Sequence, residues 1–258
     1  MNKKNSGKQE ISLISLELEN YRQYYGKQLI EFQTRDDGFT TIVGENGEGK
    51  SNLLNAMNWC FYKNEPHGKK DPVTKKPFGT VAPIVNTSYI KELKSETTGK
   101  VSVRVNLKVG DTTYSIYRNQ TILVHKLEYE KTPGGLEIMK YREFEHEDKV
   151  PAGCELVQNM SGLNIEQKGK DDLDFHPLDN TKFDTVINQI LPKSLSVFFL
   201  LDGEFLEKFW DDFKKVETGI RQILQLHLLA DAKDHVQIMN ARRISLGDGS
   251  REDKLQRD

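Results

Sequence analysis

The chain has 258 residues, of which 36% are hydrophobic and 29% are charged, and its formal net charge is −2 at pH 7. This length allows one large domain or two small ones, and the hydrophobic content supports a buried core. No run of about 18 apolar residues occurs, so the sequence predicts no membrane span and no membrane partner. The N-terminal lysines are not followed by an apolar segment, and Cys60 and Cys154 lack metal or disulfide spacing. We therefore expect a cytoplasmic protein.

The first predicted elements form a β-hairpin. Residues 1–10 predict a disordered tail. Residues 11–19 alternate between apolar and polar types, which predicts a strand with a bulge near Leu13 and Ile14. Residues 28–32 predict a second strand, joined to the first by residues 20–26.

The segment GENGEGKS at residues 44–51 matches the phosphate-binding pattern G-x-x-x-x-G-K-[ST]. The preceding residues 39–43 are rich in β-branched types and predict a short buried strand. Residues 51–62 predict a helix with one apolar face, formed by Leu53, Met57, Cys60 and Phe61. Strand, glycine loop and helix follow one another in the order that nucleotide binding requires.

The chemistry of this loop assigns roles to its residues. Its backbone N–H groups and the helix N-terminus favour an anionic β-phosphate. Lys50 is expected to reach the β- and γ-phosphates as a catalytic group, and Ser51 to bind Mg²⁺. We therefore predict an ATP and Mg²⁺ site, whose nucleotide-binding residues include Gly44, Asn46, Gly47, Glu48, Gly49, Lys50, Ser51 and Asn52.

The middle of the chain predicts a loop followed by a β-meander. The loop at residues 63–80 carries His67 and several lysines, and the sequence fits either a solvated surface or a nucleic-acid contact. The meander covers about residues 100–145, with strands at 100–109, 112–118, 122–129 and 136–144. Residues 150–180 show no clear periodicity. Residues 183–191 predict a helix that ends before Pro192.

Residues 197–204, VFFLLDGE, predict an apolar strand that ends in two carboxylates. In one interpretation Asp202 is a Walker B aspartate that holds Mg²⁺, and Glu204 lies near the attacking water, which gives a self-contained NTPase. In the other, this strand end is the metal-side loop of a two-lobed ATPase, and the Walker B aspartate lies in another segment. Beyond it, apolar residues at helical spacing predict a helix through residue 239.

Several segments together resemble the ABC-type ATPase heads of the SMC, RecF and Rad-type DNA-repair families. They include the opening strand with Asn20, Tyr21 and Arg22 and the loop at residues 44–51. Residues 22–26, 54–60 and 198–204 are similar to the DndD-like branch, found in DNA phosphorothioation systems and phage-defence ATPases. A weaker likeness covers residues 220–226, where the branch commonly has glycine and this chain has Gln225.

The resemblance implies an α/β fold. It also implies that residues 11–204 form the N-terminal lobe of an ABC-type P-loop ATPase head. It implies that residues 205–258 are a helical segment and the root of a coiled coil. Asp202 falls where related families carry the Q-loop glutamine, which favours the metal-side interpretation. Arg22 would approach the nucleotide phosphates.

The resemblance also implies partners. The ATP site would be completed by the chain's own C-terminal lobe or by a second chain, in an ATP-dependent head dimer that acts on DNA with accessory defence or repair proteins. A signature motif of the Ser-Gly-Gly type is not found in these 258 residues, so the chain alone is expected to bind ATP and hydrolyse it weakly.

Two other classes share the same loop. A P-loop kinase requires a lid with clustered arginines, and Arg242–Arg243 is the only adjacent arginine pair. A transporter-type nucleotide-binding subunit would associate with a membrane protein, and both the hairpin sequence and the predicted coiled coil argue against it.

Overall fold

A computed structural model describes residues 10–34, 39–45, 47–66, 84–140, 150–200 and 217. The chain divides into two units, Met1–Ser196 and Val197–Asp258. Several predictions lie outside the described residues: the tail at 1–9, Asn46, the lysines of the basic loop, Asp202, Glu204 and the helical segment after residue 204, apart from Glu217. The described residues thus belong to the first unit and to the start of the second, apart from Glu217.

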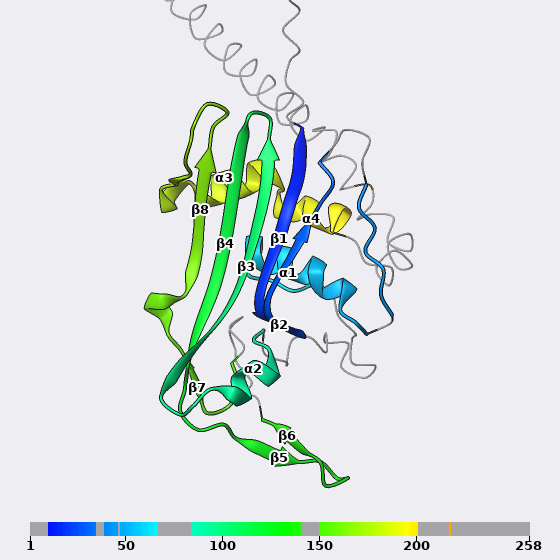
Figure 1. Cartoon of the computed structure of the whole chain (residues 1–258), viewed down its shortest axis with the longest axis vertical. Coiled ribbons are helices and arrows are strands. Elements are labelled where there is room, and N and C mark those ends of the chain that lie inside the picture. Colours follow the sequence, from blue (N-terminus) through cyan, green and yellow to red (C-terminus); the bar gives the residue numbers. More distant parts are fainter. Residues whose placement is uncertain are drawn as a thin grey trace, which may run out of the picture. The chain divides into compact units, whose positions relative to one another are not determined.

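The first unit is built on one antiparallel sheet (Figure 1). Its strand order is β2-β1-β3-β4-β8-β9, and β7 also pairs with β4. A separate two-stranded sheet, β5 and β6, extends from one end of the large sheet (Figure 1). The strands are β1 (Ile11–Tyr21), β2 (Tyr24–Glu31), β3 (Thr97–Val109), β4 (Thr112–Val124), β5 (Tyr129–Lys131), β6 (Glu137–Met139), β7 (Cys154–Leu156), β8 (Gly162–Lys168) and β9 (His176–Pro177).

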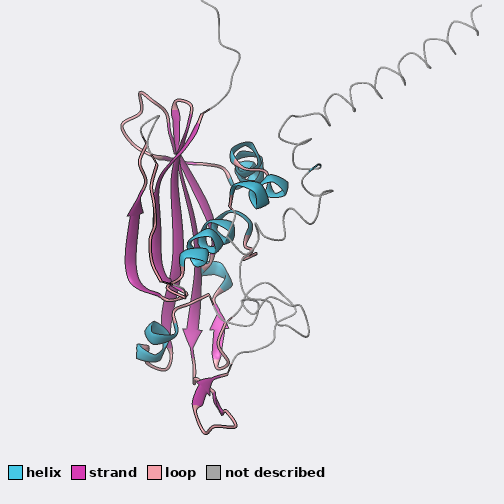
Figure 2. Cartoon of the chain, turned by 90° about the vertical axis from the view of Figure 1, so that its right-hand side faces the viewer, coloured by secondary structure: helices cyan, strands magenta, loops and turns pink. Residues whose placement is uncertain are grey.

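Short helices accompany this sheet, and Figure 2 shows α1 on one side of it. The helices are α1 (Lys50–Tyr62), α2 (Thr87–Glu92), α3 (Phe183–Ile190) and α4 (Lys193–Phe199), with 3₁₀ turns at Gln158–Met160 and Asn180–Lys182. Within the described ranges, no helix combines the length and the apolar character needed to cross a membrane.

The core lies between α1 and the sheet. On the inner face, Leu16 of β1, Val103 of β3 and Ile116 of β4 are fully buried. The residues of the predicted apolar face of α1, Leu53, Met57, Cys60 and Phe61, are all buried. Asn55, Asn58 and Trp59 are buried as well, so burial is not confined to that face. Alternation with a period of two residues thus places apolar side chains of each strand against the apolar side of the helix.

Polar contacts fix α1 to the sheet at its C-terminal end. The Arg118 guanidinium donates from Nε to the carbonyl of Cys60 (2.9 Å) and from Nη2 to that of Phe61 (3.3 Å). These are carbonyls of the last helical turn, which lack partners within the helix and favour a nearby cation. Since α1 begins directly after the glycine loop, this anchoring also holds the loop relative to the sheet.

The hairpin and the first strand of the meander lie close to where the sequence predicted them. The pairing of β1 with β3 shifts register between Leu13 and Ser15, which confirms the predicted bulge. The connection between β1 and β2 is tighter than the predicted residues 20–26, because strand pairing continues to Tyr21 opposite Tyr24. Gly110 and Asp111 join β3 to β4, between the predicted strands 100–109 and 112–118.

The later strands differ from the prediction. Residues 112–129 are not two strands, because β4 pairs with β3 without interruption from Thr112 to Val124. The partner strand holds the polar residues Asn119 and Gln120 in the ladder, although they break the apolar alternation. Residues 136–144 contribute only β6, and residues 141–149 lie outside the described part. Residues 150–180 contain β7, β8 and β9, which the sequence did not reveal because β8 is mostly polar and buries only Ile165.

The predicted buried strand at residues 39–43 is wrong for this structure. The segment has no regular secondary structure, and the side chains of Phe39 and Val43 are 85% and 87% exposed. A strand needs a hydrogen-bonded neighbour, and among the described residues none pairs with this segment. The Thr40 hydroxyl of this segment accepts a hydrogen bond from the Gln33 N–H at 2.8 Å.

The strand predicted at residues 197–204 is also wrong where it is described, because α4 is helical through Phe199. The carbonyl of Pro192 accepts the N–H groups of Leu195 (2.8 Å) and Ser196 (3.0 Å), which starts this helix. A continuous apolar run fits a buried helix as well as a buried strand, so periodicity did not separate the two.

Candidate nucleotide-binding site

The glycine loop ends at the N-terminus of α1, as predicted. Gly47 and Gly49 have φ of 95° and 100°, values in the left-handed region that favours glycine. Gly49 caps the helix and has no side chain to accept the first N–H groups. The first turn of α1 therefore directs backbone donors and the positive end of the helix dipole toward the loop.

Lys50 closes the loop with its side chain. Its Nζ donates to the carbonyls of Gly44 (2.6 Å) and Glu45 (2.7 Å). On the same loop, the Glu48 carboxylate accepts the backbone N–H of Glu45 at 2.8 Å. The structure thus brings the predicted residues Gly44, Glu48 and Lys50 together in one loop.

The turn of the β1–β2 hairpin contacts the loop from outside. The Gln23 amide Nε2 donates to the carbonyl of Glu48 (3.2 Å), and the Tyr24 hydroxyl donates to that of Gly49 (3.2 Å). The Gln23 Oε1 accepts from Asn52 Nδ2 at 2.7 Å. Of the residues in this turn, only Arg22 was predicted to belong to the site; Gln23 and Tyr24 were not. No local pattern marks them, because their importance comes from the approach of two segments that are distant in sequence.

Arg22 forms a buried ion pair. Its Nε donates to Glu65 Oε1 at 2.9 Å, and its Nη2 also bonds to Glu65 Oε2, with side chains only 10% and 4% exposed. The Tyr21 hydroxyl donates to the same carboxylate. Burial, followed by the nearby Glu65 carboxylate, raises the pKa of Tyr21 well above its ordinary value. For Arg22, burial lowers the pKa, but the hydrogen bonds and charge of Glu65 outweigh burial and raise it. The predicted approach of Arg22 to phosphates stays a prediction.

The backbone around Arg22 is held as firmly as its side chain. Asn20 and Arg22 have φ of 52° and 53°, which is unusual for residues other than glycine. The Arg22 N–H donates to the carbonyl of Ile84 (2.6 Å), and Asn86 Nδ2 donates to the carbonyl of Arg22 (2.7 Å). These contacts and the ion pair with Glu65 fix the hairpin turn beside the glycine loop.

The remaining predicted ligands are placed only in part. Ser51 lies exposed in the first turn of α1. Asn52 links two side chains by hydrogen bonds. Its Oδ1 accepts from Asn55 Nδ2 at 3.1 Å, and its Nδ2 donates to Gln23 Oε1 in the hairpin turn. Within the described ranges, no group of three or more His, Cys, Asp or Glu side chains is arranged to hold a metal ion. With Asp202 outside those ranges, the magnesium site predicted from Ser51 and Asp202 stays a prediction.

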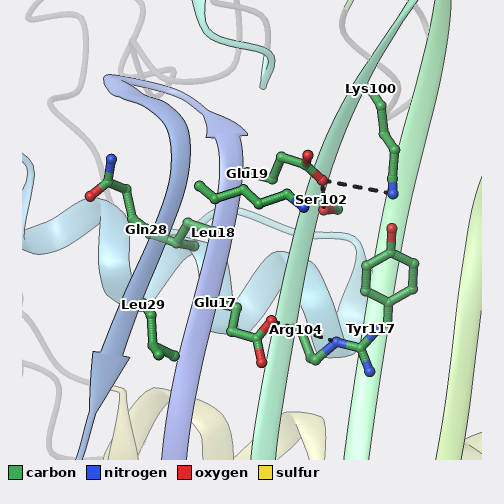
Figure 3. A pocket seen from close by; sticks show the side chains of 10 residues that line it. Glu17, Leu18, Glu19, Gln28, Leu29, Lys100, Ser102, Arg104 and Tyr117 are labelled. Atoms are coloured by element: carbon green, nitrogen blue, oxygen red, sulfur yellow. Dashed lines mark hydrogen bonds and ion pairs between the residues drawn. The ribbon is translucent and has the colours of Figure 1, made fainter.

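A hollow of about 350 Å³ lies on the outer face of the sheet, away from α1 (Figure 3). There the Arg104 guanidinium lies 4.7 Å from the centre of the Tyr117 ring and 3.9 Å from Glu17. Lys100 lies 3.7 Å from Glu19. The two cations of this hollow thus face carboxylates, which offset their positive charge.

Comparison with known proteins identifies the family to which the chain belongs. The sequence matches the model of a family described as an AAA domain over residues 15–246, and the chain belongs to that family. It is 31% identical over 100 residues to the structural maintenance of chromosomes protein 1 of Schizosaccharomyces pombe, covering 38% of this chain and 8% of the relative. It is 48% identical over 50 residues to the protein of that name in Caenorhabditis elegans, covering 19% and 4%.

A bacterial relative is similar too. The chromosome partition protein Smc of Lactiplantibacillus plantarum is 43% identical over 51 residues, covering 20% of this chain and 4% of the relative. The chain thus spans less than a tenth of the length of these relatives. A solved structure described under "Structural biochemistry of ATP-driven dimerization and DNA stimulated activation of SMC ATPases" aligns with a TM-score of 0.38 and 14% identity, covering 82% of this chain and 98% of that one.

The family match agrees with the broader part of the resemblance, since it assigns the chain to a family of AAA domains, and the relatives given above are SMC proteins. The antiparallel β-meander predicted from the alternation of about residues 100–145 is present in part, as β3 and β4. The coiled coil predicted after residue 204 lies outside the described residues, and the similarities do not distinguish the DndD-like branch.

Proposed function

We propose that this chain is the ATP-binding head of an SMC-like, DNA-acting ATPase of the DndD-like branch, working in DNA repair, phosphorothioation or anti-phage defence in the cytoplasm. The observation that carries the proposal is the glycine loop at the start of α1, with Lys50 folded across it. The names of the similar proteins concern chromosomes, which supports DNA as the partner. We also propose that accessory repair or defence proteins are partners of this head.

The residues of the loop fit ATP and Mg²⁺. Two glycines in left-handed conformations let backbone N–H groups turn toward a phosphate, and the helix N-terminus adds partial positive charge. Lys50 supplies a full positive charge for the β- and γ-phosphates, and the exposed Ser51 hydroxyl is available for Mg²⁺. ATP bound there provides the phosphoanhydride whose hydrolysis would drive the head.

The exposed segment before the loop supports a composite site. Phe39 and Val43 present large apolar side chains to solvent, and Leu29 on the edge strand β2 is 60% exposed. Burying one such side chain contributes about 1.5–3 kcal/mol. A complementary lobe, from the same protein or from a second chain, would cover these residues and supply the rest of the catalytic machinery in an ATP-dependent head dimer.

We expect the 258-residue chain to bind ATP and to hydrolyse it barely above background, because the complementary lobe supplies part of the catalytic machinery. Phosphate release measured at saturating ATP and Mg²⁺ tests this expectation. Turnover near 1 s⁻¹ or above, within the range of about 1–10³ s⁻¹ that complete enzymes show, would contradict the composite site. It would instead favour a self-contained NTPase with Asp202 and Glu204 as its acidic residues.

The replacement Asp202→Asn tests whether this carboxylate acts at the metal. If it does, the variant keeps most of its ATP affinity but needs more Mg²⁺ to reach it, because an amide binds the cation and its water shell less strongly than a carboxylate. The measurement is a Mg²⁺ titration of ATP binding, with Asp179→Asn as a control on an exposed 3₁₀ turn. An unchanged titration in Asp202→Asn places the residue away from the metal.

A further inference from the structure

The hairpin turn binds the glycine loop through two consecutive carbonyl groups. Gln23 Nε2 donates to the carbonyl of Glu48, and the Tyr24 hydroxyl donates to the carbonyl of Gly49, each at 3.2 Å. The amide of Gln23 also lies directly against Gly49, since a Cβ built on that glycine would be 1.1 Å from Gln23 Nε2. The Gly49 carbonyl also accepts the N–H of Asn52 at 2.8 Å, the first backbone hydrogen bond of α1, so the helix and Tyr24 together hold this peptide group.

Holding a carbonyl fixes the direction of the N–H in the same peptide group. A trans peptide is planar, and its C=O and N–H point to opposite sides. The carbonyl of Glu48 shares its peptide group with the N–H of Gly49, and the carbonyl of Gly49 shares its group with the N–H of Lys50. When both carbonyls point toward the hairpin, both N–H groups point away from it.

We propose that Gln23 and Tyr24 are positioning residues for polyphosphate binding, which orient the Gly49 and Lys50 N–H groups before the ligand arrives. The inference rests on the proposed function, because it assigns those N–H groups to the phosphates of a nucleoside triphosphate. Donors that are already oriented bind an anion without the entropic cost of ordering the loop. Gln23 and Tyr24 therefore raise affinity without touching the ligand themselves.

The turn is rigid enough for this role. Its backbone is tied to Ile84 and Asn86, and Arg22 is tied to Glu65. On the other side, Asn52 in the first turns of α1 donates to Gln23 Oε1, so the glutamine bridges the loop and the helix. The amide of Gln23 is thus fixed at both of its polar atoms, and it sets the peptide orientation instead of following it.

The test compares Gln23→Leu and Tyr24→Phe with two matched controls from the same hairpin. Gln28→Leu removes an amide that donates to the carbonyl of Tyr25 at 2.9 Å, and Tyr25→Phe removes a hydroxyl that donates to Glu92 at 2.6 Å. Calorimetry of the full chain measures binding of ATP and of inorganic tripolyphosphate in the presence of Mg²⁺. Thermal unfolding without ligand reports any general loss of stability.

We expect Gln23→Leu to weaken ATP binding about tenfold and Tyr24→Phe about fivefold, as expected for loss of ordinary hydrogen bonds. Tripolyphosphate should lose affinity by the same factors, because the effect acts on the phosphate donors. The midpoint of thermal unfolding should stay within the range of the two controls. In NMR spectra of the free protein, the Gly49 and Lys50 amide resonances should shift in these variants and not in the controls.

Two results separate the inference from the proposed function. If the wild-type chain binds neither ATP nor tripolyphosphate, the proposed function fails and the inference fails with it. If the wild-type chain binds both, and Gln23→Leu and Tyr24→Phe bind them as tightly as the controls do, only the inference is overturned. A loss of affinity that follows a matching loss of thermal stability would also overturn it, since it shows a merely structural role.

Discussion

Replacing Lys50 with alanine is expected to weaken ATP binding by about a hundredfold or more. The ammonium would form charge-assisted hydrogen bonds to the β- and γ-phosphates, and one such bond contributes about 1.5–3 kcal/mol. The folded structure should change little, because the groups that Lys50 contacts are carbonyls at the partly exposed mouth of the loop. Equilibrium binding of a fluorescent ATP analogue, competed with ATP, measures the loss.

The matched control for this change is Lys91→Ala, which removes an exposed lysine from the last turn of α2. It should bind ATP as the wild type does, because Lys91 lies outside the glycine loop. If Lys50→Ala keeps the wild-type affinity, the assignment of residues 44–51 as the phosphate site is wrong. Equal losses in both variants would indicate a general electrostatic effect and would argue against a specific contact.

Replacing Glu65 with alanine is expected to lower the free energy of unfolding by about 3–5 kcal/mol. Glu65 is 4% exposed and neutralises Arg22, and it also accepts the Tyr21 hydroxyl. Its loss removes the carboxylate to which the buried Arg22 guanidinium donates through Nε and Nη2. Chemical denaturation followed by tryptophan fluorescence measures the change, since Trp59 packs against Tyr21 with ring centres 5.8 Å apart.

An exposed ion pair provides the control. Glu128 and Lys140 lie 3.8 Å apart with side chains about half exposed, so Glu128→Ala should cost less than about 1 kcal/mol. The double replacement of Arg22 by Met and Glu65 by Leu should recover most of the stability lost in Glu65→Ala, because no buried charge remains. A cost for Glu65→Ala no greater than that for Glu128→Ala would refute the buried pair.

Local patterns in the sequence predicted the parts of the fold that depend on local rules. The glycine loop and α1 follow from spacing, and the shift of register in β1 follows from the interruption of alternation at Leu13 and Ile14. The helix α3 ends at Ile190, two residues before Pro192, as the proline requires. In each case the residues that decide the structure lie within a few positions of one another.

Elements that depend on a distant partner were predicted poorly. β8 exists because it pairs with β4, although its own residues alternate little. Residues 39–43 have strand composition, but the described residues give them no neighbouring strand. The same reason explains why Gln23 and Tyr24 were missed at the site, since their contacts with Glu48 and Gly49 join segments that are 25 residues apart.

Amide chemical-shift mapping shows whether residues 44–51 bind the phosphates of ATP. In spectra of the ¹⁵N-labelled chain titrated with ATP and Mg²⁺, the largest saturable shifts should fall on Gly47, Gly49, Lys50 and Ser51. Tripolyphosphate should shift the same amides in the same direction. If ATP leaves these amides unchanged, or if its largest shifts fall on the outer face of the sheet around Arg104 and Tyr117, residues 44–51 are not the phosphate site.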